Sequence, residues 1–170
     1  MSVKRSQQFV RLAASMSVLT SLAMPCFAQS VLSEKQISLT LAQEAATAAI
    51  AQCRKNGYRV SVTVVDRAGQ VKVMVRDDSA SPHTVDASRR KAYTSLTFRI
   101  GTAEFTKRVS SNPAAINLKD LNDVILLAGG LPILAGKEVI GAIGVGGAPG
   151  GDKDEVCAQA GIDRISDRLK

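Results

Sequence analysis

The chain contains a single histidine, His83, within the polar segment 77–84 (DDSASPHT). One imidazole excludes sites built from several histidines, including zinc motifs that need paired His or Cys ligands. One imidazole is sufficient as an axial ligand of a haem iron, because the macrocycle supplies the other four donors. His83 is therefore a candidate haem ligand, and the alternative is an ordinary surface or helix-capping histidine.

Three consecutive cations, Arg89, Arg90 and Lys91, follow His83 on a predicted helix. Successive side chains on a helix point about 100° apart, so the three cannot all face one ligand. An arginine pair suits haem propionates, phosphates or carboxylates. The alternative is a solvated stretch of surface charge.

Two glycine-rich segments are further candidates. Residues 144–151 (GVGGAPGG) precede a predicted helix, and free amides at a helix start favour anions. No Lys-Ser or Lys-Thr follows, so this is not a Walker sequence. Residues 129–132 (GGLP) fit either a β-bulge or a backbone that lies close to a ligand. A tight turn is the alternative for the first segment.

The N-terminus predicts an export signal. It begins with a positive region that lacks acids, and residues 12–24 carry no charge. That length is typical of a signal peptide and too short to cross a bilayer core. The small residues Cys26 and Ala28 precede a cut before Gln29. We predict a cleavable signal over residues 1–28 and a periplasmic or secreted mature protein; an uncleaved anchor is the alternative.

Cleavage would remove three cations and lower the formal net charge from +7 to +4. Nucleic-acid binding usually needs a dense basic patch with aromatic platforms, whereas this chain has no Trp and is 4% aromatic. No later stretch is long and apolar enough to span a bilayer. The expected partner is a small anionic ligand, not nucleic acid or a membrane.

Two cysteines, Cys53 and Cys157, follow the predicted signal. An oxidising compartment would allow them to pair. Both lie on the inward stripes of predicted helices, so their sulfur atoms meet if those helices pack side by side on one sheet face. Two buried free thiols are the alternative.

Hydrophobic periodicity predicts one α/β (α+β) domain at residues 38–170, after a leader at residues 29–37. Thr40 and Gln43 form a capping box for the first helix. Helices are expected at 40–56, about 82–100, 102–109 and from 152 onward, and one or two helical turns are expected from residue 112. A five-stranded, largely antiparallel sheet with helices on its faces is expected from strands at 60–64, 71–76, 124–127, 131–135 and 139–146.

These segments resemble the GlcG/HbpS family. The likeness covers about residues 38–168 and rests on 60–69 (VSVTVVDRAG), 88–94 (SRRKAYT), 129–132 (GGLP) and 139–147 (VIGAIGVGG). The resemblance implies a profilin-like three-layer domain that is commonly oligomeric. It also implies similarity to the C-terminal domain of PduO-type corrinoid adenosyltransferases.

Members of the family are described as binding haem, and some are linked to glycolate or alcohol metabolism or to haem sensing. The resemblance implies pocket positions at Lys91, Tyr93, Thr94, Gly129, Gly130, Pro132, Gly146 and Gly147. It brings no shared catalytic residue and no universal iron ligand. The role of His83 is therefore an inference from this chain alone.

Three functions are consistent with these features. The first is a periplasmic haem-binding protein, and the second is an accessory protein or enzyme acting on a small organic acid. The third is a structural oligomer without catalytic activity. Acid–base groups other than His83 and scattered carboxylates are few, so the sequence favours a protein that is not an enzyme. The resemblance implies a homo-oligomer with haem as its cofactor.

Overall fold

The computed structural model describes residues 31–170, so the predicted signal at 1–28 lies outside the described residues. Residues Ser33–Lys170 form one unit. The helices are α1 (Leu39–Lys55), α2 (His83–Phe98), α3 (Thr102–Ser110) and α4 (Gly151–Ile165), with 3-10 helices η1 (Pro113–Asp120) and η2 (Ser166–Arg168). The strands are β1 (Ser61–Asp66), β2 (Val71–Arg76), β3 (Gly130–Ala135) and β4 (Glu138–Gly146). No helix in this part of the chain has the length and hydropathy needed to cross a membrane.

The sheet has the strand order β2-β1-β4-β3, and every neighbouring pair is antiparallel. The strands expected at 60–64 and 71–76 are confirmed as β1 and β2, which form an antiparallel hairpin with Val62 opposite Val75. Its turn is held by Asp66, whose carboxylate accepts hydrogen bonds from the Ala68 and Gln70 amides. Gly69 has a φ of +79°, a conformation that favours glycine.

The predicted strand at 124–127 is wrong, and the sheet has four strands instead of five. The Ile125 amide donates to the Thr94 hydroxyl at 2.9 Å, and Arg90 donates to the Val124 carbonyl. Side chains of α2 therefore satisfy backbone groups that a strand partner would otherwise bind. Val124 is buried with Phe105 and Val109 of α3. Periodicity alone does not distinguish a short apolar run that forms a strand from one that is buried in another conformation.

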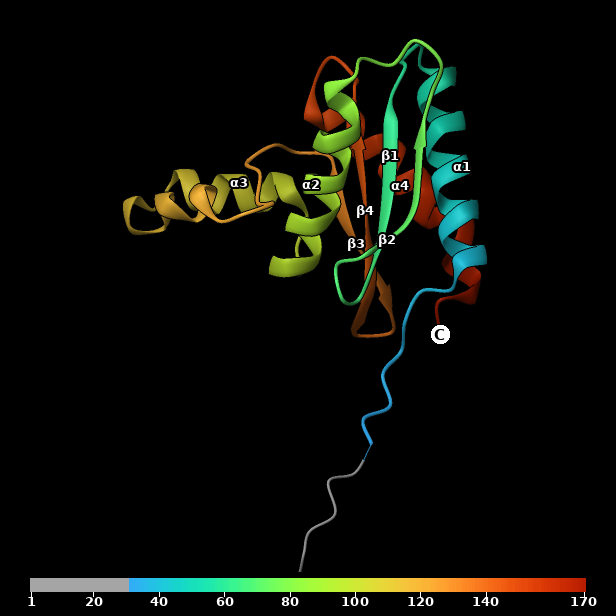
Figure 1. The fold of residues 1–170 in the computed structure, drawn as a ribbon, viewed down its shortest axis with the longest axis horizontal. Coiled ribbons are helices and arrows are strands. Elements are labelled where there is room, and N and C mark those ends of the chain that lie inside the picture. Colours follow the sequence, from blue (N-terminus) through green and yellow to red (C-terminus); the bar gives the residue numbers. More distant parts are fainter. Residues whose placement is uncertain (1–30) are drawn as a thin grey trace, which may run out of the picture. The chain divides into compact units, whose positions relative to one another are not determined.

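The helices cover both faces of the sheet, as Figure 1 shows: α1 and α4 lie on one face and α2 on the other. The main core lies between the sheet and the α1–α4 pair. Alanines on α1 and Gly161 on α4 let these helices approach closely; a Cβ at Gly161 would lie 2.6 Å from the Ala45 carbonyl oxygen. This close packing brings the two cysteines together.

The N-cap of the first helix lies two residues before the predicted one. Ser38, not Thr40, is the N-cap, and its hydroxyl accepts from the Leu41 amide at 3.2 Å. The preceding Ile37 is buried, and its amide donates to the Ile140 carbonyl of β4. Burial of Ile37 fixes the chain at its entry, so the next polar residue becomes the cap.

Cys53 of α1 and Cys157 of α4 form a disulfide with a Cα–Cα distance of 5.5 Å, which confirms the expected bridge. The two cysteines are 104 residues apart, so the bridge closes most of the domain into one loop. Such a loop restricts the unfolded chain strongly.

We expect the Cys53→Ser/Cys157→Ser double variant to lose about 2–5 kcal/mol of unfolding free energy, because the unfolded chain regains the freedom that the bridge removes. Urea unfolding followed by circular dichroism measures the loss. Wild-type protein unfolded in reductant is the control and should match the variant. Equal stability of oxidised and reduced wild-type protein would contradict a bridge.

Candidate ligand-binding site

Two cavities divide the predicted pocket residues between the two ends of α2. The first, here called the His83 cavity, has a volume of about 320 Å³ and includes His83, Lys91, Gly146 and Gly147 in its lining. The second, called the Arg67 cavity, has a volume of about 590 Å³ and is lined from α2 by Tyr93, among others. The remaining predicted positions line neither cavity.

The position of α2 on the sheet is set by close backbone contact and buried hydroxyl pairs. A Cβ at Gly144 would overlap the Ser88 carbonyl oxygen, so glycine there lets the helix lie directly on β4. Ser88 pairs with Thr63 at 2.8 Å, and Ser61 pairs with Thr84 at 2.7 Å. These bonds satisfy hydroxyls that would be costly to bury alone.

The loop before α2 is anchored by the buried carboxylate of Asp77. Arg54 donates to both of its oxygens, at 2.6 and 2.9 Å, and holds the pKa of Asp77 below its ordinary value. The Asp77 carbonyl also accepts from the Ala80 amide, and the Ala80 carbonyl accepts from Arg76. The chain therefore enters α2 at His83 along a fixed path.

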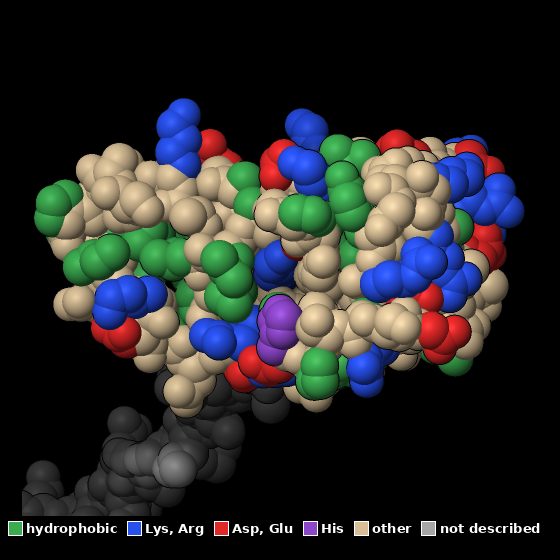
Figure 2. Space-filling model, turned by 90° about the horizontal axis from the view of Figure 1, so that it is seen from above, with side chains coloured by type: hydrophobic (Ala, Val, Ile, Leu, Met, Phe, Trp, Pro, Cys, Tyr) green, Lys and Arg blue, Asp and Glu red, His purple; other side chains and the backbone are tan. Residues whose placement is uncertain are grey.

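His83 is the first residue of α2, and its side chain is exposed at the cavity. Figure 2 shows the histidine at the surface, with cationic, acidic and hydrophobic side chains around it. Among the described residues, the imidazole has no hydrogen-bond or ion-pair partner. Its ring nitrogens are therefore available to a ligand.

A buried ion pair lines the cavity beneath His83. Lys91 Nζ lies 2.7 Å from Asp154 Oδ2 and donates to the Val145 carbonyl at 3.0 Å, and the Lys91 and Asp154 side chains are 5% and 4% exposed. Burial raises the pKa of Asp154, against the opposing effect of Lys91. Asp154 Oδ1 also accepts from the Ala148 amide. The Asp154 carboxylate therefore binds the Ala148 amide, which the glycine-rich loop would otherwise offer to an anion.

Sequence reasoning missed Asp154. An acid in the first turn of a helix is already explained by the helix dipole, so the run Asp152 to Glu155 carried no further signal. The available clue was Lys91, which a close-packed helix places inward. A buried lysine almost always requires a partner.

The glycines of the two predicted segments differ in role. Gly146 and Gly147 line the cavity, and Gly147 has a φ of +133°. Gly129 and Gly130 pack behind it: a Cβ at Gly129 would lie 2.9 Å from Lys91 Nζ, and one at Gly130 would overlap the Lys91 carbonyl. The second pair therefore makes room for the ion pair and for α2.

Three of the remaining predicted residues hold the segment Asp123 to Ile125 against α2. Arg89 forms ion pairs with Asp86 at 2.8 Å and Asp123 at 2.7 Å. Arg90 donates to the Val124 carbonyl, and the Thr94 hydroxyl accepts from the Ile125 amide. Pro132 lies on β3, opposite Ala142 of β4. These side chains are engaged with the protein itself.

No group of three or more His, Cys, Asp or Glu side chains within residues 31–170 is arranged to hold a metal ion.

Residues 37–163 match the family described as "Haem degrading protein HbpS-like", and the chain belongs to this family. GlcG of Escherichia coli is 31% identical over 109 residues, which cover 62% of this chain and 80% of GlcG. These matches confirm the resemblance seen in the sequence.

Two solved structures are similar to this chain. A double mutant of Streptomyces reticuli HbpS has 39% identity and a TM-score of 0.75, with coverage of 83% of this chain and 96% of that one. The structure entitled "PduOC:Heme Complex" has 23% identity and a TM-score of 0.71, with coverage of 76% and 95%. The second likeness shows a shared fold.

We expect Lys91→Met to lower the unfolding free energy by about 3–5 kcal/mol, because it leaves the Asp154 carboxylate buried without its cation. Urea unfolding measures the change. Lys91→Met/Asp154→Asn should recover much of it, since the uncompensated charge is gone. Arg89→Met, which breaks exposed ion pairs, is the control and should cost within about 1 kcal/mol.

The deficit of Lys91→Met should also depend on pH. Burial already raises the pKa of Asp154, and loss of Lys91 removes a charge that lowers it. A carboxyl whose folded-state pKa is raised costs stability as pH rises above its unfolded pKa. The deficit should therefore be larger at about pH 7 than at about pH 4. A pH-independent deficit would contradict the uncompensated carboxylate.

Proposed function

We propose that the protein binds haem at the His83 cavity and works as an exported, periplasmic or secreted ligand-binding protein. The observation that carries the proposal is the exposed, unbonded imidazole of His83 at a cavity of an HbpS-like domain. Imidazole is a common axial ligand of haem iron. Haem, when bound, supplies the redox-active iron, and the residues of the His83 cavity hold the haem in place.

The residues of the cavity fit a flat, largely apolar group. Leu127 is 51% exposed, and together with Ala87 and Ala128 it forms an apolar wall. Gly146 and Gly147 complete the lining with backbone; a Cβ at Gly147 would lie 2.6 Å from the Arg59 carbonyl oxygen, so glycine there keeps this backbone close against the segment that leads into β1. Apolar walls with a few placed polar groups are typical of cofactor sites.

Two further observations support the proposal. The related structure of PduOC is entitled a heme complex, and it shares this fold. The disulfide between Cys53 and Cys157 suits an oxidising compartment, as does the export signal expected at residues 1–28.

Self-association is part of the proposal. Ile116 of η1 and Leu121, which directly follows η1, are exposed apolar side chains outside the His83 cavity. Contiguous exposed apolar surface commonly marks protein–protein contact. Light scattering on the purified protein should give a mass of more than one chain.

We expect hemin titration of the mature protein to produce a Soret band, and His83→Ala to shift that band and weaken binding by about tenfold or more, the scale of one lost ligand bond. Absorbance titration measures both quantities. Gln159→Ala, an exposed change on α4, is the control and should behave as wild type. An unchanged spectrum and affinity in His83→Ala would rule out His83 as the iron ligand.

A further inference from the structure

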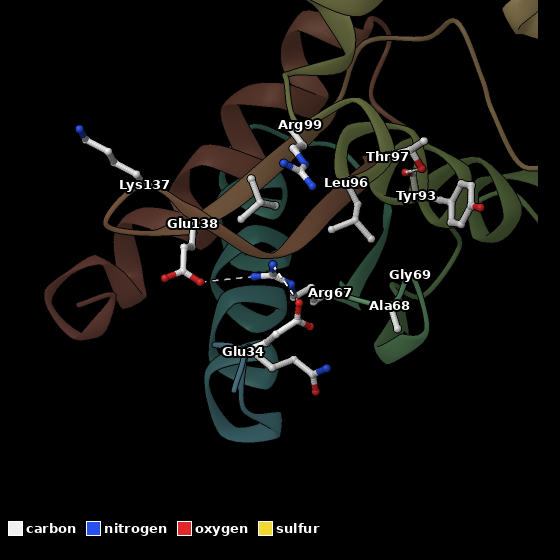
Figure 3. Close-up of a pocket in the computed structure, with 12 residues that line it drawn as sticks. Glu34, Arg67, Ala68, Gly69, Tyr93, Leu96, Thr97, Arg99, Lys137 and Glu138 are labelled. Carbon is white, nitrogen blue, oxygen red and sulfur yellow. Dashed lines mark hydrogen bonds and ion pairs between the residues drawn. The ribbon is translucent and has the colours of Figure 1, made fainter. Parts of the chain in front are cut away.

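The Arg67 cavity is not used by the haem proposal. It lies between four segments that are distant in the sequence: the β1–β2 turn, the β3–β4 turn, the C-terminal half of α2 and the residues that precede α1 (Figure 3). Its volume of about 590 Å³ is in the range of small-molecule sites. The class of ligand depends on which of its polar groups are already bound within the protein.

The two carboxylates of this cavity are already bound. Arg67 forms ion pairs with Glu34 at 3.3 Å and with Glu138 at 3.4 Å, and Figure 3 shows both carboxylates directed at its guanidinium. Arg67 thus ties the residues before α1 and the β3–β4 turn to the β1–β2 turn. Because a cation of the protein faces both carboxylates, they repel a bound anion less than free carboxylates would.

Arg99 carries an unpaired guanidinium in the same cavity. The side chain lies just past the last residue of α2, and in Figure 3 its guanidinium points into the cavity, whereas Lys137 points away from it. Within residues 31–170 the guanidinium forms no hydrogen bond or ion pair. A cation at a helix C-terminus commonly binds the last carbonyls, but Arg99 donates to none of them. Its N–H groups are therefore available to a ligand.

The backbone of Arg99 is also unfavourable for a residue with a side chain. Its φ is +57°, in the left-handed region. Helices commonly end in this conformation on glycine, because a Cβ there is strained. Backbone strain of this kind gathers at ligand sites. Glycine would relieve the strain but would remove the guanidinium from the cavity, so the conformation points to a role for the side chain.

Apolar side chains form the cavity wall beside Arg99. They are Leu96 of α2 and Val139 of β4, together with the ring of Tyr93. A Cβ at Gly69 would lie 3.0 Å from that ring, so Tyr93 is packed against the β1–β2 turn. A guanidinium binds a carboxylate through two parallel hydrogen bonds, and the apolar wall favours burial of hydrocarbon next to it.

We propose that the Arg67 cavity binds a small organic acid with an apolar body. Its carboxylate lies on the Arg99 guanidinium, and its hydrocarbon part lies against Leu96 and Val139. Arg67 keeps the two neighbouring carboxylates occupied. The site is separate from the His83 cavity and does not rest on the haem proposal.

An NMR titration of ¹⁵N-labelled protein at neutral pH tests the proposal with butyrate and benzoate. At least one of these acids should bind saturably and shift the amide signals of residues 96–99 and 139. Butanol, which lacks the carboxylate, and inorganic phosphate, which lacks the apolar body, should each bind at least about tenfold more weakly. Failure of both acids to bind overturns the proposal, as does equal binding of either reference compound.

Arg99→Gly sharpens the test, because glycine suits the backbone there. The variant should keep a Tm no lower than wild type and lose about tenfold or more in affinity for the better acid, the scale of one lost charged contact. Lys107→Gln removes an exposed cation outside the cavity and should change neither quantity. His83→Ala should keep full acid binding, whatever its effect on haem binding. Retained affinity in Arg99→Gly, or lost affinity in His83→Ala, contradicts the assigned site.

Discussion

The buried ion pair of Lys91 and Asp154 is the interaction on which the candidate haem site depends. It joins α2, on one face of the sheet, to the first turn of α4, on the other. A buried charge is tolerated only when it is paired and hydrogen-bonded. Glycines at positions 129, 130 and 144 let the backbones approach until the pair forms. The same contact closes the base of the His83 cavity and orders the glycine-rich loop.

Helix α2 links the two cavities while keeping their chemistry apart. Its first residue, His83, offers an imidazole nitrogen beside apolar walls. Arg99, just past its last turn, lines the Arg67 cavity, where Arg67 is ion-paired with Glu34 and Glu138. The hydroxyl pairs with β1 hold the helix rigidly on the sheet. One fixed element therefore lines both cavities, each with a different set of side chains.

Local patterns in the sequence predicted much of the fold. The hydrophobic periodicity of β1 and β2 and the helical stripes that carry Cys53 and Cys157 led to correct elements. The run at 124–127 misled because its backbone is bound by side chains of α2, a tertiary effect that periodicity does not carry. Asp154 and the Arg67 cavity were missed because each depends on segments that only the fold brings together.

The central claim is that this HbpS-like chain carries haem at His83. Native mass spectrometry of the protein isolated from the cells that produce it tests this claim most directly, since retained ligand and subunit number are read together. The account predicts an oligomer whose mass includes haem, and a His83→Ala protein of the same subunit number without it. Wild-type protein that carries no haem, even after exposure to hemin, would contradict the account.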